Sequence, residues 1–100
     1  MTGDKQKTKQ YQLKLYVAGM TPSAERALEN IRRIAEEHLE ENYEIEVINL
    51  EDHPEKAEEA QIFAVPTLVR NLPPPLRKIV GDLSNEEKVL VGLDLRAKES

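Results

Sequence analysis

The chain of 100 residues contains no cysteine. It therefore has no disulfide, no thiolate nucleophile and no cysteine-ligated metal site. It also lacks an apolar run of the ~20 residues that a membrane-spanning helix needs, and no secretory signal core follows Met1. We expect one small cytoplasmic domain over residues 11–97, with polar tails at 1–10 and 98–100.

Motifs that support common enzyme chemistries are absent as well. The sequence holds no Walker loop, no G-x-G-x-x-G and no G-x-S-x-G. Its two histidines, His38 and His53, have no further zinc ligands at the usual spacing. We expect His38 to be a partly buried packing residue on or beside the apolar face of the first helix, and His53 to face solvent. We therefore predict no enzymatic activity, no catalytic residue, no cofactor and no metal site.

The charge balance limits the class of partner. The formal net charge is -5 at pH 7. Nucleic acids and anionic membranes need clustered positive charge, so we expect neither as the main partner. Three basic residues, Arg70, Arg77 and Lys78, nevertheless flank a run of prolines. They either serve solubility or form a basic patch that docks an acidic partner.

Hydrophobic periodicity predicts the elements of an α/β domain. A helix is expected from the N-cap Thr21, with Pro22 as its first residue, to Leu39, because apolar residues recur there at helical spacing. Alternating apolar residues or short apolar runs predict strands over 11–17, 44–50, 67–69 and 77–80. A short acidic helix, which Asp52 can cap, is expected over about 54–61. The first two strands flank the long helix, so they should pair in parallel.

The stretch LSNEEKVLVGLDLRA, residues 83–97, supports two incompatible predictions. Ser84 and Glu87 form an S-x-x-E capping box, which predicts a helix. Alternating apolar residues from Val89 onward predict a strand instead, and Gly92 costs a helix roughly 1 kcal/mol relative to alanine. Because the competing terms are of similar size, the local sequence does not decide between them. We favour the helix.

The step Val65-Pro66-Thr67 is typical of the loop that thioredoxin-type proteins place opposite their reactive cysteines. That cysteine pair would lie near residues 19–22, where Met20 and Thr21 stand instead. The loop therefore cannot serve thiol chemistry in this chain.

Four segments of the sequence are distinctive: KLYVAG, PTL, LPPP and IVGDLSNEEKVLVGLDL, at residues 14–19, 66–68, 72–75 and 79–95. Together they resemble the KaiB family of circadian-clock proteins. The resemblance implies a protein without chemistry of its own that binds the N-terminal ring of the ATPase KaiC. It also implies capture of KaiA by the bound form in cyanobacterial clocks, and competition with the KaiB-like sensor domain of a histidine kinase.

The KaiB resemblance implies two alternative folds. One is a thioredoxin-like monomer with the element order βαβαββα, which is the form that binds KaiC. The other is a ground-state form with the order βαββααβ, which is usually tetrameric. The switch remodels the second half of the chain, so Pro66 would lie at the boundary of the segment that changes. We predict the thioredoxin-like α/β fold for the resting chain, because the capping box at Ser84 favours the last helix.

The resemblance also assigns roles to individual residues. The residues that match basic positions tied to partner binding are Arg26, Arg70, Arg77 and Lys78. The residues expected to govern the fold switch are Pro66, Pro73, Pro74, Pro75, Gly92 and Asp94. Glycine weakens a helix, Asp94 places negative charge towards a helix C-terminus, and X-Pro isomerisation is slow enough to gate a switch.

Departures from the family pattern leave alternatives open. Glu44 and Glu46 make the second strand more acidic than we expect of a clock-type member, and that strand contributes to the KaiA side. KaiA capture is therefore in doubt. A sensor or adaptor that acts on a kinase or stress pathway outside a clock is a second hypothesis. A thioredoxin-like glutathione-binding enzyme that uses Thr21 or Tyr16 is a third, although the chain has no room for the helical domain such enzymes carry.

Overall fold

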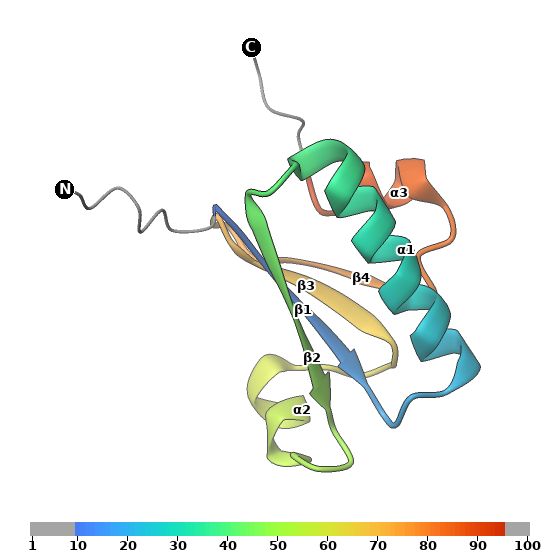
Figure 1. The fold of residues 1–100 in the computed structure, drawn as a ribbon. Coiled ribbons are helices and arrows are strands. Elements are labelled where there is room, and N and C mark those ends of the chain that lie inside the picture. Colours follow the sequence, from blue (N-terminus) through green and yellow to red (C-terminus); the bar gives the residue numbers. More distant parts are fainter. Residues whose placement is uncertain (1–9, 96–100) are drawn as a thin grey trace, which may run out of the picture.

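The computed structural model describes residues 10–95, and Figure 1 shows their arrangement. The elements, in chain order, are β1 (Tyr11–Val17), α1 (Pro22–Leu39), β2 (Tyr43–Asn49), α2 (Glu55–Ala60), β3 (Thr67–Leu72), β4 (Arg77–Val80) and α3 (Glu86–Gly92). This order is βαβαββα, so the predicted thioredoxin-like fold is confirmed and the structure does not adopt the order βαββααβ. Apart from Gln10, the predicted tails lie outside the described residues.

The four strands form one mixed sheet in the order β2-β1-β3-β4. β1 pairs in parallel with β2, as predicted, and the register runs from Tyr11 opposite Tyr43 to Val17 opposite Asn49. β3 runs antiparallel to both β1 and β4, and it extends to Leu72, beyond the predicted strand. β2 and β4 are therefore the two edges of the sheet.

The larger core lies between the sheet and the helices α1 and α3 (Figure 1). Alternation along β1 directs Leu13 and Leu15 into this core, where both are almost fully buried. α1 begins as predicted, since Oγ1 of Thr21 accepts a hydrogen bond of 3.1 Å from the amide of Ala24 and Pro22 follows the cap. The buried residues of α1 are Ala24, Ala27, Ile31, Ile34, Ala35 and Leu39.

A smaller core lies on the other face of the sheet, beneath α2. Its buried members are Tyr16, Ile48, Ile62 and Val69, with Leu50, Ala57 and Ala60 packed against them. α2 is short and contains no buried residue, so it covers this face only in part. Pro54 precedes the helix without any side-chain cap, and the predicted capping role of Asp52 is therefore wrong.

The start of α3 differs from the prediction by one residue. Oδ1 of Asn85 accepts a hydrogen bond of 3.1 Å from the amide of Lys88 and caps the helix, so the predicted capping box of Ser84 and Glu87 is wrong. Ser84 instead belongs to the preceding turn, where its amide donates to Oδ1 of Asp82 at 3.1 Å. The choice of a helix rather than a strand is confirmed.

None of the helices within residues 10–95 combines the length and the apolar character needed to cross a membrane. The cytoplasmic location inferred from the sequence stays a prediction.

Candidate functional site

Arg70, one of the expected partner-binding residues, is buried inside the second half of the chain. Only 2% of Arg70 is exposed. Its Nη1 donates hydrogen bonds to the carbonyls of Leu93 at 2.8 Å and Asp94 at 3.1 Å, and its Nη2 donates to the carbonyl of Pro75 at 2.7 Å. Arg70 therefore joins β3 to the proline loop and to the segment after α3, and it presents no charge at the surface in this fold.

Arg77 and Lys78 lie on the edge strand β4, and both are exposed. Nζ of Lys78 donates to the carbonyls of Ala60 at 2.7 Å and Gln61 at 2.9 Å, at the C-terminal end of α2. A cation at this end of a helix satisfies carbonyls that lack an intrahelical partner. The structure thus does not assemble one open basic patch, because Arg70 is buried and Lys78 is bonded to α2.

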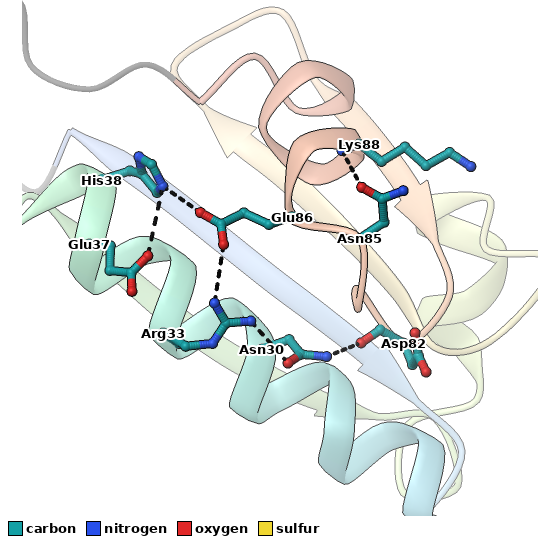
Figure 2. Close-up of polar contacts among 8 residues, drawn as sticks. All are labelled: Asn30, Arg33, Glu37, His38, Asp82, Asn85, Glu86 and Lys88. Carbon is teal, nitrogen blue, oxygen red and sulfur yellow. Dashed lines mark hydrogen bonds and ion pairs between the residues drawn. The ribbon is translucent and has the colours of Figure 1, made fainter.

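Polar side chains connect α1 to the segment around α3, and Figure 2 shows most of them. We name this set the α1–α3 clasp; it consists of Arg26, Asn30, Arg33, His38, Asp82 and Glu86. Nε of Arg26 lies 3.5 Å from Oδ2 of Asp82, and Asn30 donates to the Asp82 carbonyl at 2.8 Å. Arg33 and His38 both contact the carboxylate of Glu86, at 3.2 and 2.7 Å.

Both carboxyl groups of the clasp have a lowered pKa, Glu86 through other members of the clasp and Asp82 mainly through the neighbouring Ser84. Hydrogen bonds from His38 and then Arg33 lower the pKa of Glu86. Hydrogen bonds from Ser84, and to a smaller extent Arg26, lower the pKa of Asp82. His38 is partly buried, as expected. Its partner Glu86 lies 48 residues away, so local sequence patterns could not predict the pair.

The prolines expected to govern the fold switch lie at both ends of β3. The peptide bonds before Pro66, Pro73 and Pro75 are cis. Pro66 is buried, and its carbonyl accepts a hydrogen bond of 2.9 Å from the amide of Gly81. The carbonyl of Pro75 accepts from Arg70, and both Pro74 and Pro75 are exposed.

The other two expected switch residues lie at the end of α3. Gly92 is in the last turn, and a Cβ at this position would lie 3.2 Å from Cδ1 of Ile79 on β4. Asp94 follows the helix with a φ of 52°, in the left-handed region, and its Oδ2 lies 4.0 Å from Nη1 of Arg70. Both residues therefore lie where α3 meets β3 and β4.

An exposed apolar surface near the start of β3 had no counterpart in the sequence analysis. Phe63 is 91% exposed, and Val65 is also exposed just before β3. Val80, which is exposed on β4, lies opposite Thr67 in the ladder. Exposed aromatic and aliphatic side chains of this kind are typical of a surface that another protein covers. Sequence periodicity cannot find such residues, because an apolar side chain at a loop boundary looks the same whether it is buried or exposed.

Comparison with known proteins identifies the family. The family model described as the KaiB domain matches residues 14–95. The chain belongs to the KaiB family. It is 54% identical to the circadian clock oscillator protein KaiB of Microcystis aeruginosa over 91% of this chain and 88% of that one. It is 53% identical to the protein of the same name from Trichodesmium erythraeum, with the same coverage of both chains.

Solved structures confirm the fold class of this KaiB family member. The N-terminal domain of Synechococcus elongatus SasA is similar with a TM-score of 0.72 and 20% identity, over 93% of this chain and 91% of that one. Mitochondrial thioredoxin 3 from Saccharomyces cerevisiae is similar with a TM-score of 0.67 and 16% identity, over 91% and 83%. At these identities the likeness concerns the fold alone. Met20 and Thr21 stand near where thioredoxin-type proteins are expected to carry their reactive cysteines.

Proposed function

We propose that this chain is a non-enzymatic regulator that binds the N-terminal ring of a KaiC-type ATPase in a circadian clock or a related timing system. The observation that carries the proposal is the family membership, with 54% identity over 91% of the chain to a circadian clock oscillator protein. The absence of cysteine and of nucleotide-binding loops from the sequence is consistent with action by binding alone.

The element order supports binding in the thioredoxin-like form. The KaiB resemblance assigns ring binding to the order βαβαββα, which this structure has. The exposed candidates for the contact are Arg26, Arg77 and the apolar residues around Phe63. Arg70 and Lys78 would act indirectly, by holding the proline loop, α2 and α3 in place. In this form we propose a cytoplasmic monomer.

Fold switching remains part of the proposal. In the order βαββααβ the second half would be remodelled, so the hydrogen bond of Arg70 with Leu93 and the packing of α3 against β4 would have to be replaced. We propose that the prolines flanking β3, together with Gly92 and Asp94, set the balance between the two forms. A tetramer would accompany the ground-state form.

Ring binding is tested by titrating the fluorescently labelled chain into an isolated N-terminal ring of a KaiC-type ATPase with ATP, followed for hours to allow slow switching. We expect a complex, and we expect Phe63→Ala and Arg77→Ala to weaken it at least tenfold, as for residues that carry interface energy. Lys88→Ala, which removes an exposed cation on α3, is the matched control and should bind within twofold of the parent chain. No complex with the ring would refute the proposal.

The same assay separates the remaining partners. The KaiB-like sensor domain of a histidine kinase should compete with the chain for the ring. KaiA, added to the preformed complex, should bind weakly or not at all if the acidic residues Glu44 and Glu46 on β2 disfavour that contact. Binding to a sensor kinase without binding to the ring would instead favour the adaptor hypothesis.

A further inference from the structure

Three metal-ligating side chains meet where the last turn of α1 faces the first turn of α3, as Figure 2 shows for Glu37, His38 and Glu86. Nε2 of His38 lies 2.7 Å from Oε2 of Glu86 and 4.0 Å from Oε1 of Glu37. The three potential ligand atoms all lie within 4.8 Å of one another. His38 and Glu86 are partly buried, and Glu37 is more exposed.

The ligand atoms suit zinc. Imidazole nitrogen and carboxylate oxygen are both ligands that Zn²⁺ takes in proteins, and water can fill the fourth position of its tetrahedron. Bonds of about 2.0–2.2 Å in a tetrahedron place ligand atoms about 3.3–3.6 Å apart. His38 and Glu86 would therefore separate slightly from 2.7 Å, and Glu37 would approach His38 from 4.0 Å.

The neighbouring arginine leaves the required oxygen free. Nη1 of Arg33 lies 3.2 Å from Oε1 of Glu86, whereas His38 contacts Oε2 of the same carboxylate. Arg33 thus orients Glu86 through the oxygen that a metal would not use, as partners outside the ligand set do in many metal sites. The negative charges of Glu37 and Glu86 together exceed the positive charge of Arg33, so a divalent cation would be attracted to the cluster.

We propose that Glu37, His38 and Glu86 bind a zinc ion that joins α1 to α3. Sequence spacing predicted no such site, because Glu86 lies 48 residues from His38 and only the fold brings them together. The ligands come from two elements that meet in this fold, so bound zinc stabilises the fold by mass action. The inference does not depend on ring binding.

The test uses the full chain without a polyhistidine tag, titrated with ZnCl₂ by isothermal calorimetry and against a fluorescent zinc chelator. We expect His38→Asn and Glu37→Gln each to weaken Zn²⁺ binding at least tenfold. The matched controls are His53→Asn, which removes the other histidine beside a carboxylate at 3.9 Å, and Glu87→Gln, which removes an exposed charge next to Glu86. Both controls should bind within twofold of the parent chain.

Amide NMR spectra provide a second readout. Zinc should shift the amides of residues 36–39 and 85–88, and Mg²⁺, which prefers oxygen ligands, should leave them unchanged. Equal zinc affinity in the His38→Asn and His53→Asn variants, shifts centred on another part of the chain, or no binding at millimolar zinc would overturn the proposal. Because Glu37 is mostly exposed, its variant keeps the test valid if His38→Asn fails to fold. Ring binding measured in the presence of a zinc-selective chelator tests the proposed function separately, because no zinc is then available to the chain.

Discussion

Nη1 of Arg70 on β3 donates a hydrogen bond of 2.8 Å to the carbonyl of Leu93, a residue 23 positions further along the chain. Both residues are almost completely buried. The guanidinium is held mainly by the carbonyls of Leu93, Asp94 and Pro75. Its Nε is buried without a hydrogen-bond partner among the described residues. One side chain therefore fixes both the proline loop and the end of α3 relative to β3.

Arg70→Met should destabilise this fold by about 3 kcal/mol, because it leaves buried carbonyls without donors while it keeps much of the side-chain length. The free energy of unfolding is measured by urea denaturation. Arg77→Met is the control, since Arg77 lies opposite Arg70 in the ladder but is exposed. It should change stability by no more than about 0.5 kcal/mol. Equal losses in the two variants would show that the buried contacts of Arg70 are not what matters.

Asn85→Ala should destabilise α3 by about 1 kcal/mol, the usual cost of removing an N-cap. Ser84→Ala should cost less, because Ser84 does not cap the helix and interacts only with the turn at Asp82. Thermal unfolding followed by circular dichroism compares the two variants directly. A larger loss for Ser84→Ala would restore the capping box that the sequence predicted.

The elements with strong periodicity could be predicted from the sequence, and the contacts between distant residues could not. β1 and α1 have their predicted bounds because alternation and the Thr21-Pro22 cap are local signals. The stretch around α3 was ambiguous because local terms of similar size oppose each other. The fold resolves it: Val89 and Leu93 are buried against the main core, and Val91 is 74% exposed. A strand would have placed all three on one face.

The expected partner residues show the same limit. Arg70, Arg77 and Lys78 are basic residues close together in the sequence, and that pattern left a shared basic patch open beside a role in solubility. Alternation along β3 and the packing of α3 decide instead that Arg70 is buried. Phe63, with 91% of its surface exposed, carries no local signal of exposure. Burial of long polar side chains and exposure of apolar ones are set by tertiary contacts, so neither can be obtained from composition or spacing.

Acid should weaken the α1–α3 clasp. The pKa of Glu86 and of Asp82 is lower in the folded chain than its usual value. As the pH falls, the unfolded chain therefore takes up protons on these carboxyl groups before the folded chain does. The stability that the two carboxylates contribute is complete above their unfolded pKa of about 4, and it is lost as the pH falls through their folded pKa. We expect the free energy of unfolding to decrease on acidification below about pH 5.

The Glu86→Gln variant tests which carboxyl group causes this acid sensitivity. It removes one of the two groups with a lowered pKa, so stability should depend less steeply on pH between about 5 and 3 than in the parent chain. Glu87→Gln is the matched control, because it removes the same charge from an exposed neighbouring position. Urea denaturation at a series of pH values gives the slopes. Identical slopes for the Glu86→Gln variant and the parent chain would contradict the role of the clasp.

Gly92→Ala should stabilise the thioredoxin-like form by about 0.5 kcal/mol. Alanine gains roughly 1 kcal/mol over glycine in a helix, and the 3.2 Å contact of the new Cβ with Cδ1 of Ile79 offsets part of that gain. Ile79 is only partly buried, so the end of its side chain can move. Urea denaturation measures the change in the free energy of unfolding.

The Ile79→Val background tests whether that contact sets the size of the effect. Valine lacks the Cδ1 atom, so Gly92→Ala should gain close to the full ~1 kcal/mol there, and the double-mutant cycle should show a favourable coupling. An equal gain in both backgrounds would mean that the Gly92–Ile79 contact is irrelevant. If the fold switch operates as proposed, the Gly92→Ala single variant should also bind the ATPase ring faster than the parent chain. The reason is that more of its molecules already have the binding-competent order βαβαββα.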